Sequence, residues 1–162
     1  MFRLVRNLIF LVFIFFVGYL FGIKEVRFYK VVSSSMQPTL KPGDRQISVK
    51  PGKLRRYDIV NLIAPQGTPD ILVKRVIGLP GETIEIKSGE VLIGREKISE
   101  PYLLEKPDYE LKMVIPANCY FLLGDNRNQS EDSSLWGPVS RNRITGRVVF
   151  IYWPRSSLRI VR

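Results

Sequence analysis

Three hydroxyl side chains stand together at 33–35, at the start of the segment Ser-Ser-Ser-Met-Gln-Pro-Thr-Leu that ends at residue 40. The segment follows an extended stretch at 26–32, and its proline marks a turn. Serines in such a turn either bond their own backbone or present a nucleophile. The chain contains no histidine, which excludes a Ser-His-Asp triad, a Cys-His pair and an HExxH zinc site. An activated serine would therefore need a carboxylate, or a lysine of lowered pKa, as its base.

A lysine in the segment 71–77, which reads Ile-Leu-Val-Lys-Arg-Val-Ile, is the candidate base. Strand alternation places Lys74 on one face with Leu72 and Val76, and Arg75 on the other face. Arginine stays protonated in proteins, whereas a lysine desolvated among aliphatic side chains loses its proton more readily. The alternative is an edge-strand lysine that deters aggregation.

The third polar segment, at 124–137, reads Gly-Asp-Asn-Arg-Asn-Gln-Ser-Glu-Asp-Ser-Ser-Leu-Trp-Gly and follows an apolar run. Asp, Asn and Ser at this density are typical of a loop that fixes its backbone through side-chain hydrogen bonds. The carboxylate spacing does not match an EF-hand, because no Glu stands at the twelfth position. We therefore predict a structural scaffold beside a site and no metal.

The elements that must position these segments begin with an apolar N-terminus. Residues 7–23 carry no charge and would reach about 26 Å as a helix. We predict that residues 1–24 form a membrane anchor with one transmembrane helix. A cleaved signal peptide is the first alternative, but no small-x-small site follows. A buried core helix is the second, but the run is apolar on every face. Two Lys or Arg residues precede the run and three follow it, which does not set the orientation.

Residues 25–162 are predicted to form a compact, mostly β catalytic domain with an antiparallel sheet, because short apolar or alternating runs recur between Gly, Pro and Asp. A small accessory region is expected at about 82–116. The expected strands lie at 26–32, 46–50, 58–64, 71–77, 83–87, 91–93, 109–114, 119–123 and 147–153.

The net charge of +10 is spread along the chain. A solvated basic surface explains it, and the charge alone leaves contact with anionic lipid or nucleic acid as the alternative. With the other features of the chain, no nucleic-acid partner is expected. The single cysteine, Cys119, falls in an apolar run and is interpreted as a small buried residue.

Taken in order, three segments resemble the motif boxes of the bacterial-type type I signal peptidases. They read Ser-x-Ser-Met-x-Pro-Thr-Leu at 33–40, Lys-Arg-Val-Ile-Gly-Leu-Pro-Gly-Glu at 74–82 and Gly-Asp-Asn-Arg-x-x-Ser-x-Asp-Ser at 124–133. The resemblance implies a membrane-bound serine endopeptidase that removes N-terminal signal peptides from exported preproteins and needs no cofactor. It also implies a single-pass protein of the inner or plasma membrane with its catalytic domain on the extracytoplasmic side.

Residue by residue, the resemblance makes Ser35 the nucleophile and Lys74 its general base. Ser33 and the backbone N–H of Ser35 match the oxyanion hole. Ser130 matches the serine that orients the lysine, and Asp132 matches the carboxylate that holds the loop.

Three further positions match the residues that line the family's pockets for small substrate side chains: Val31, Leu40 and Val73. The chain also departs from the family pattern. Val32 and Ser34 stand where the first box usually has Pro and Gly, and Ser134 stands where the third box usually has Arg.

A further departure concerns the family's Gly-Asp-x-x-x-Val strand, which here carries Gln46 and Ser48 on one face.

Two alternative functions stay open. One is a pro-protein maturation peptidase of a conjugation or organelle system, and the other is a non-enzymatic, membrane-tethered basic β module. A self-cleaving repressor would carry a DNA-binding domain where this chain has its apolar run.

The short tether between the apolar run and the active serine predicts where the site lies. Twelve residues separate Ile23 from Ser35, which reach roughly 40 Å at most, so Ser35 is expected close to the bilayer. Phe28, Tyr29 and Met36 are expected as interface contacts, with packing in the sheet as the alternative.

Overall fold

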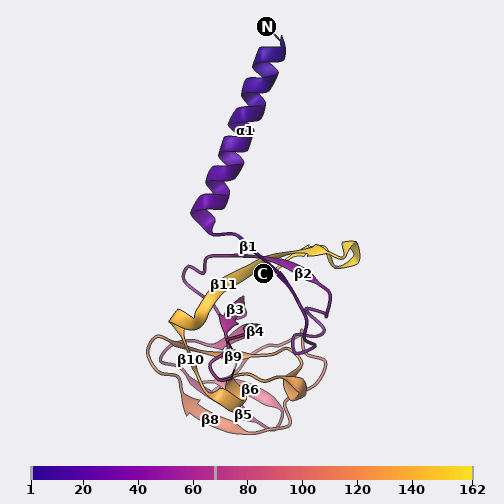
Figure 1. Cartoon of the computed structure of the whole chain (residues 1–162). Coiled ribbons are helices and arrows are strands. Elements are labelled where there is room, and N and C mark those ends of the chain that lie inside the picture. Colours follow the sequence, from indigo (N-terminus) through magenta and orange to yellow (C-terminus); the bar gives the residue numbers. More distant parts are fainter. Residues whose placement is uncertain (1, 68, 162) are drawn as a thin grey trace.

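A long helix stands clear of a β-rich body in the computed structural model, which describes residues 2–67 and 69–161 (Figure 1). Helix α1 covers Phe2–Lys24, and its apolar side chains between Leu8 and Phe16 are at least half exposed. Within the described part of the chain, no helix combines the length and the apolar character needed to cross a bilayer. A helix is thus present where the anchor is predicted, but the transmembrane span itself is not confirmed.

The main sheet is antiparallel, and its strands run in the order β1-β2-β11-β3-β4-β9-β10, with β12 added beside β11. The bounds of these strands are Arg27–Lys30 (β1), Arg45–Val49 (β2), Ile59–Ile63 (β3), Ile71–Gly78 (β4), Cys119–Leu123 (β9), Val139–Ser140 (β10), Ile144–Trp153 (β11) and Arg159–Ile160 (β12). Because β3 lies between two partners and is buried on both faces, its residues are almost all apolar.

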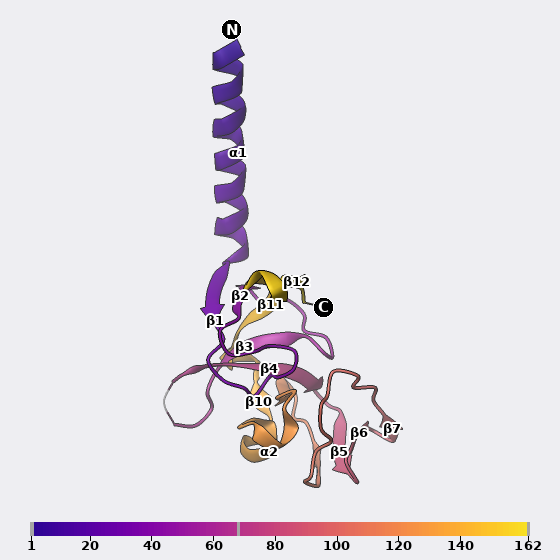
Figure 2. The same ribbon diagram turned by 90° about the vertical axis from the view of Figure 1, so that its right-hand side faces the viewer.

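A second antiparallel sheet, in the order β7-β6-β5-β8, lies at the end of the body far from α1 (Figures 1 and 2). Its strands are Thr83–Lys87 (β5), Glu90–Ile93 (β6), Glu96–Lys97 (β7) and Leu111–Val114 (β8). These strands fall within the range expected for the accessory region. Ile84 and Ile86 of this sheet pack in one core with Ile77 and Phe121 of the main sheet.

Short helical turns complete the structure: η1 (Arg127–Gln129), α2 (Ser133–Trp136), η2 (Arg141–Arg143) and η3 (Arg155–Ser157). The mostly antiparallel β fold predicted from the sequence is confirmed, and each of the nine expected strands corresponds to an observed one. The two-residue strands β7, β10 and β12 were not predicted, because so few residues show no alternation.

A buried ion pair joins the main sheet to the polar segment after β9. The Arg75 guanidinium donates from Nε and Nη2 to the two carboxylate oxygens of Asp125, at 2.7 and 2.5 Å. It also donates to Tyr57 O and Thr39 Oγ1, and its charged end lies 3.9 Å from the centre of the Tyr102 ring. Arg75 therefore fixes the start of this segment from the face of β4 opposite Lys74.

Candidate active site

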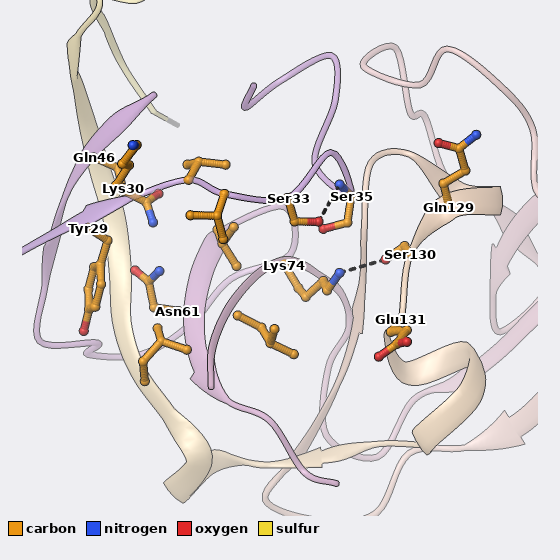
Figure 3. A pocket seen from close by; sticks show the side chains of 15 residues that line it. Tyr29, Lys30, Ser33, Ser35, Gln46, Asn61, Lys74, Gln129, Ser130 and Glu131 are labelled. Atoms are coloured by element: carbon orange, nitrogen blue, oxygen red, sulfur yellow. Dashed lines mark hydrogen bonds between the residues drawn. The ribbon is translucent and has the colours of Figure 1, made fainter. Parts of the chain in front are cut away.

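A pocket of about 500 Å³ is lined by residues from the three segments that carry the candidate chemistry, 33–40, 71–77 and 124–137 (Figure 3). Ser33 and Ser35 come from the turn after β1, Lys74 comes from β4, and Ser130 and Glu131 come from the loop after β9. Among the described residues, no group of three or more metal-binding side chains is gathered. The chemistry available in the pocket is therefore that of hydroxyls, amides, the amines of Lys30 and Lys74, and the Glu131 carboxylate.

Ser35 is held by a tight turn whose apolar residues act as anchors. Leu40 N donates to Met36 O at 2.8 Å, and Gln37 N donates to Ser34 O at 3.0 Å. Met36 and Leu40 are wholly buried in a core with Val31, whereas Ser35 keeps 6% of its surface exposed. Met36 thus packs in the protein interior, and its expected contact with the membrane interface is wrong.

The backbone N–H of Ser35 donates to Ser33 Oγ at 3.2 Å. The two groups expected to form an oxyanion hole are therefore adjacent and bonded to each other in this conformation (Figure 3). A Ser33 hydroxyl that accepts from Ser35 N keeps its own proton free to donate elsewhere.

Lys74 is 2% exposed, and its Nζ donates to Ser130 Oγ at 2.9 Å. Burial lowers the pKa of Lys74 to about 8, because removal from water disfavours the charged amine. The carboxylates of Asp132, Glu131 and Asp125 oppose this shift. Desolvation, the cause expected from the sequence, is the largest contribution, and the opposing carboxylates could not be placed without the fold.

Asp132 holds the loop without an arginine partner. Its Oδ2 accepts from Gly124 N at 2.8 Å, and its Oδ1 accepts from the backbone N–H and the hydroxyl of Ser134 at 3.0 and 2.8 Å. Asp132 is also the N-cap of α2. Ser134, which replaces the arginine usual at this position of the motif, therefore supplies hydrogen bonds to the carboxylate in place of an opposite charge.

Arg127 secures the same loop from the side of the accessory region. Its side chain is fully buried, pairs with the Glu100 carboxylate and donates from Nε to Gly124 O at 3.1 Å. The Tyr102 hydroxyl donates to Glu100 at 2.8 Å. Segment 98–103 thus supports the loop that carries Ser130.

Gly124 is a residue of this site that sequence reasoning missed. A Cβ on Gly124 would lie 2.2 Å from Ser130 Oγ and 2.5 Å from Ser35 O, so only glycine lets these two serines approach from either side. The contact is reinforced by a hydrogen bond from Asn126 N to Ser35 O at 3.0 Å. The available signal was a glycine placed directly after an apolar strand.

The expected pocket residues lie in two different environments. Val31 and Val73 line the pocket, whereas Leu40 is buried in the core and does not. Sequence reasoning did not expect the amides of Gln46 and Asn61 in the lining. Figure 3 shows both amides at the end of the pocket opposite Ser130.

Comparison with known proteins gives consistent matches. Residues 1–153 match the family described as signal peptidase, peptidase S26. A signal peptidase I of Leptolyngbya laminosa is 40% identical over 148 residues, which cover 84% of this chain and 72% of that protein. A probable thylakoidal processing peptidase 2 of Arabidopsis thaliana is 39% identical over 140 residues. This match covers 79% of this chain but only 38% of the plant protein.

A solved structure resembles part of the chain. The crystal structure of a signal peptidase I from Enterococcus faecalis V583 matches with a TM-score of 0.55 and 31% sequence identity. The match covers 59% of this chain and 97% of that chain. The mostly antiparallel β body is thus shared with a protein of known structure.

Replacing Lys74 by Met should raise the free energy of unfolding at pH 7. A folded-state pKa of about 8 against an ordinary value of 10.5 corresponds to about 3 kcal/mol. Between these values the folded chain binds fewer protons than the unfolded chain, so wild-type stability rises with pH. The advantage of Lys74→Met should therefore be largest below pH 8 and shrink toward pH 10.5. Denaturant unfolding of the full chain in detergent at pH 7 and pH 10 measures it.

The matched control for this measurement is Lys53→Met, at an exposed lysine. It should change stability by well under 1 kcal/mol at either pH, as is usual for surface substitutions. An equal gain for Lys74→Met at both pH values, or no gain, would contradict the assignment of a desolvated amine.

Proposed function

This chain belongs to the signal peptidase family, peptidase S26, and we propose that it cleaves N-terminal signal peptides from exported preproteins with Ser35 as nucleophile and Lys74 as general base. The observation that carries this mechanism is the buried Lys74 amine, which bonds Ser130 in the pocket that Ser35 also lines. The protein is a serine endopeptidase, and the roles of the individual residues are part of our proposal.

The reaction begins with Lys74 in its neutral form. Its Nζ takes the proton from Ser35 Oγ as this oxygen attacks the carbonyl carbon of the scissile bond. The resulting ammonium then gives the proton to the departing amine, which leaves an ester between the signal peptide and Ser35. Neutral Lys74 next takes a proton from water, whose oxygen attacks the ester. The ammonium then returns this proton to Ser35 Oγ as the ester bond breaks, which releases the signal peptide and restores the neutral amine. Ser130 keeps the amine oriented throughout by its hydrogen bond.

The oxyanion of each tetrahedral intermediate would be bound by the Ser33 hydroxyl and the Ser35 N–H. These groups bond each other in the absence of substrate. Rotation of Ser33 about χ1 would free the Ser35 N–H and turn the Ser33 hydroxyl toward the oxyanion, so that both groups could donate to it. Asp132 and Gly124 act as positioning residues, since they fix the loop that carries Ser130.

We propose that the substrate has small side chains at the first and third positions upstream of the cleaved bond. Val31 and Val73 belong to the apolar part of the pocket wall, and Leu40 lies in the core cluster against which this part of the wall packs. The valines are themselves packed against Leu40 and Met36, so the wall cannot easily move to admit a large group.

We also propose that α1 attaches the protein to a lipid bilayer, as a single anchor in the inner or plasma membrane. Exposed apolar side chains surround the helix, including Phe10, Phe13 and Phe16, each at least 55% exposed. Such a surface is stabilised by lipid rather than by water. In line with the family resemblance, we propose that the β-rich body lies on the extracytoplasmic side, where exported preproteins emerge.

Activity should rise with pH as Lys74 loses its proton. Because the pKa of Lys74 lies at about 8, kcat/KM of the full chain in detergent should climb on a limb centred near pH 8. Lys74→Arg should abolish turnover, since guanidinium does not deprotonate. Ser35→Ala should do the same, which separates a peptidase from a binding module. An active arginine variant with an unchanged pH profile would rule out the proposed dyad.

A bulky residue just before the cleaved bond should slow cleavage. Overpacking an apolar site commonly costs about 1 to 3 kcal/mol, which corresponds to roughly tenfold to a hundredfold in rate. Two signal-peptide substrates that differ only in Ala or Phe at this position provide the measurement. Equal kcat/KM values for the two would show that Val31 and Val73 do not limit this pocket.

A charge introduced on α1 should weaken attachment to lipid. Phe13→Lys places an ammonium at a position that is 61% exposed, and a lysine near the centre of a membrane helix costs about 3 kcal/mol. Flotation of the full chain with phospholipid vesicles measures attachment. Leu135→Lys, at an exposed residue outside α1, is the control and should float like the wild type. Unchanged flotation of Phe13→Lys would count against the anchor.

A further inference from the structure

The far wall of the active-site pocket is polar although it belongs to a buried face of the main sheet. On β2 the buried positions are Gln46 and Ser48, whereas the apolar Ile47 and Val49 between and after them are only half-buried. Asn61 of β3 is also buried and lines the same pocket as Gln46. Strand β2 thus reverses the usual placement of apolar residues inside and polar residues outside. The buried amides of Gln46 and Asn61 therefore need an explanation.

Gly146 brings two of these side chains together across β11. Asn61 is the cross-strand partner of Gly146, and Ser48 is the partner of the nearby Val148. A Cβ on Gly146 would lie 3.1 Å from Ser48 Cβ and 3.6 Å from Asn61 Oδ1. Since glycine leaves this space open, Ser48 Oγ donates to Asn61 Oδ1 at 2.5 Å over the strand that separates them. The Asn61 amide is therefore held in a fixed orientation.

Gln46 has a buried acceptor that no protein group satisfies. The side chain is 1% exposed, and its Oε1 has no hydrogen-bond partner among the described residues. A buried polar atom without a partner is destabilising, and natural structures contain few of them. The Oε1 atom itself is buried, but Gln46 lines the active-site pocket, so rotation of its amide would turn this acceptor toward a group that enters the pocket.

The position of the Gln46 amide fits the side chain at the third position upstream of the cleaved bond. Side chains two residues apart in an extended peptide lie on one face, about 7 Å apart. Asn61 is the cross-strand partner of Val73, and Gln46 is the partner of Tyr29, two residues before Val31. Both amides therefore border the valines of the proposed upstream pockets, and they lie at the end opposite Ser130 (Figure 3).

We propose that Gln46, supported by the Ser48–Asn61 pair, forms a polar subsite that selects a hydrogen-bond-donating side chain at the third position upstream of the cleaved bond. Serine, threonine and asparagine have the required chemistry. This inference rests on the proposed function and adds a substrate preference to it. Gln46 acts as a specificity-determining residue, and the chemical step is unchanged.

Neutral donors fit this subsite better than apolar or charged groups. An apolar side chain would exclude water and leave Gln46 Oε1 unpaired, and sites with buried polar groups discriminate against ligands that lack the matching group. A carboxylate would place its oxygens against the Gln46 acceptor. A lysine or arginine would approach Lys30, which borders the same pocket.

The test compares two signal-peptide substrates that differ only at the third upstream position, where one has serine and the other has α-aminobutyrate, a methyl in place of the hydroxyl. Both carry alanine next to the cleaved bond. Full-length wild-type protein in detergent should show a kcat/KM about tenfold higher for the serine peptide, which is the effect of one hydrogen bond. Gln46→Leu should remove or reverse this preference. Gln66→Leu, at an exposed glutamine, should keep it.

The outcomes separate the subsite from the activity. Cleavage of neither peptide would overturn the proposed function, and the subsite with it. Cleavage of both at equal rates, or faster cleavage of the α-aminobutyrate peptide, would overturn the subsite and leave the peptidase assignment intact. A serine preference that persists in Gln46→Leu would also overturn the role of Gln46. The wild-type comparison requires no variant, so it is decisive even if Gln46→Leu does not fold.

Discussion

The proposed mechanism depends on one physical requirement, which is that the Lys74 amine must lose its charge beside three carboxylates. Nearby negative charge raises the pKa of Lys74, whereas burial lowers it, and burial has the larger effect. Two of the three carboxylates also have other partners. Asp125 is bound by Arg75, and Asp132 accepts hydrogen bonds from Gly124 and Ser134. These groups therefore stabilise the loop, and their negative charge raises the pKa of Lys74 by less than burial lowers it.

The accessory sheet contributes to the same requirement, although it lies at the far end of the body. Segment 98–103 supplies the Glu100 carboxylate to Arg127 and the Tyr102 ring to Arg75. Both arginines hold the loop that begins at Gly124, one through its backbone and one through Asp125. Removing one partner of a buried ion pair is strongly destabilising. The segment that carries Glu100 is therefore needed to hold the site loop in place.

Sequence reasoning found the strands and the chemical groups, because alternation and the lack of histidine are local or compositional facts. It placed Lys74 and Arg75 on opposite faces of one strand, which the structure bears out. It did not find the role of Gly124, the burial of Leu40 away from the pocket, or the Ser48–Asn61 bond across Gly146. These features depend on which strands become neighbours, and the residue pattern of one strand does not identify its partner.

Ser35, Lys74 and Ser130 come from three distant parts of the chain, so they lie together only in the folded protein. An unfolded copy exposes Lys74 to water, where its amine stays protonated at neutral pH, and no loop brings Ser130 to it. In the proposed mechanism, an unfolded molecule thus carries all the residues of the site but no neutral amine to act as the base. The proposed hydrolytic activity would therefore be a property of the folded protein alone.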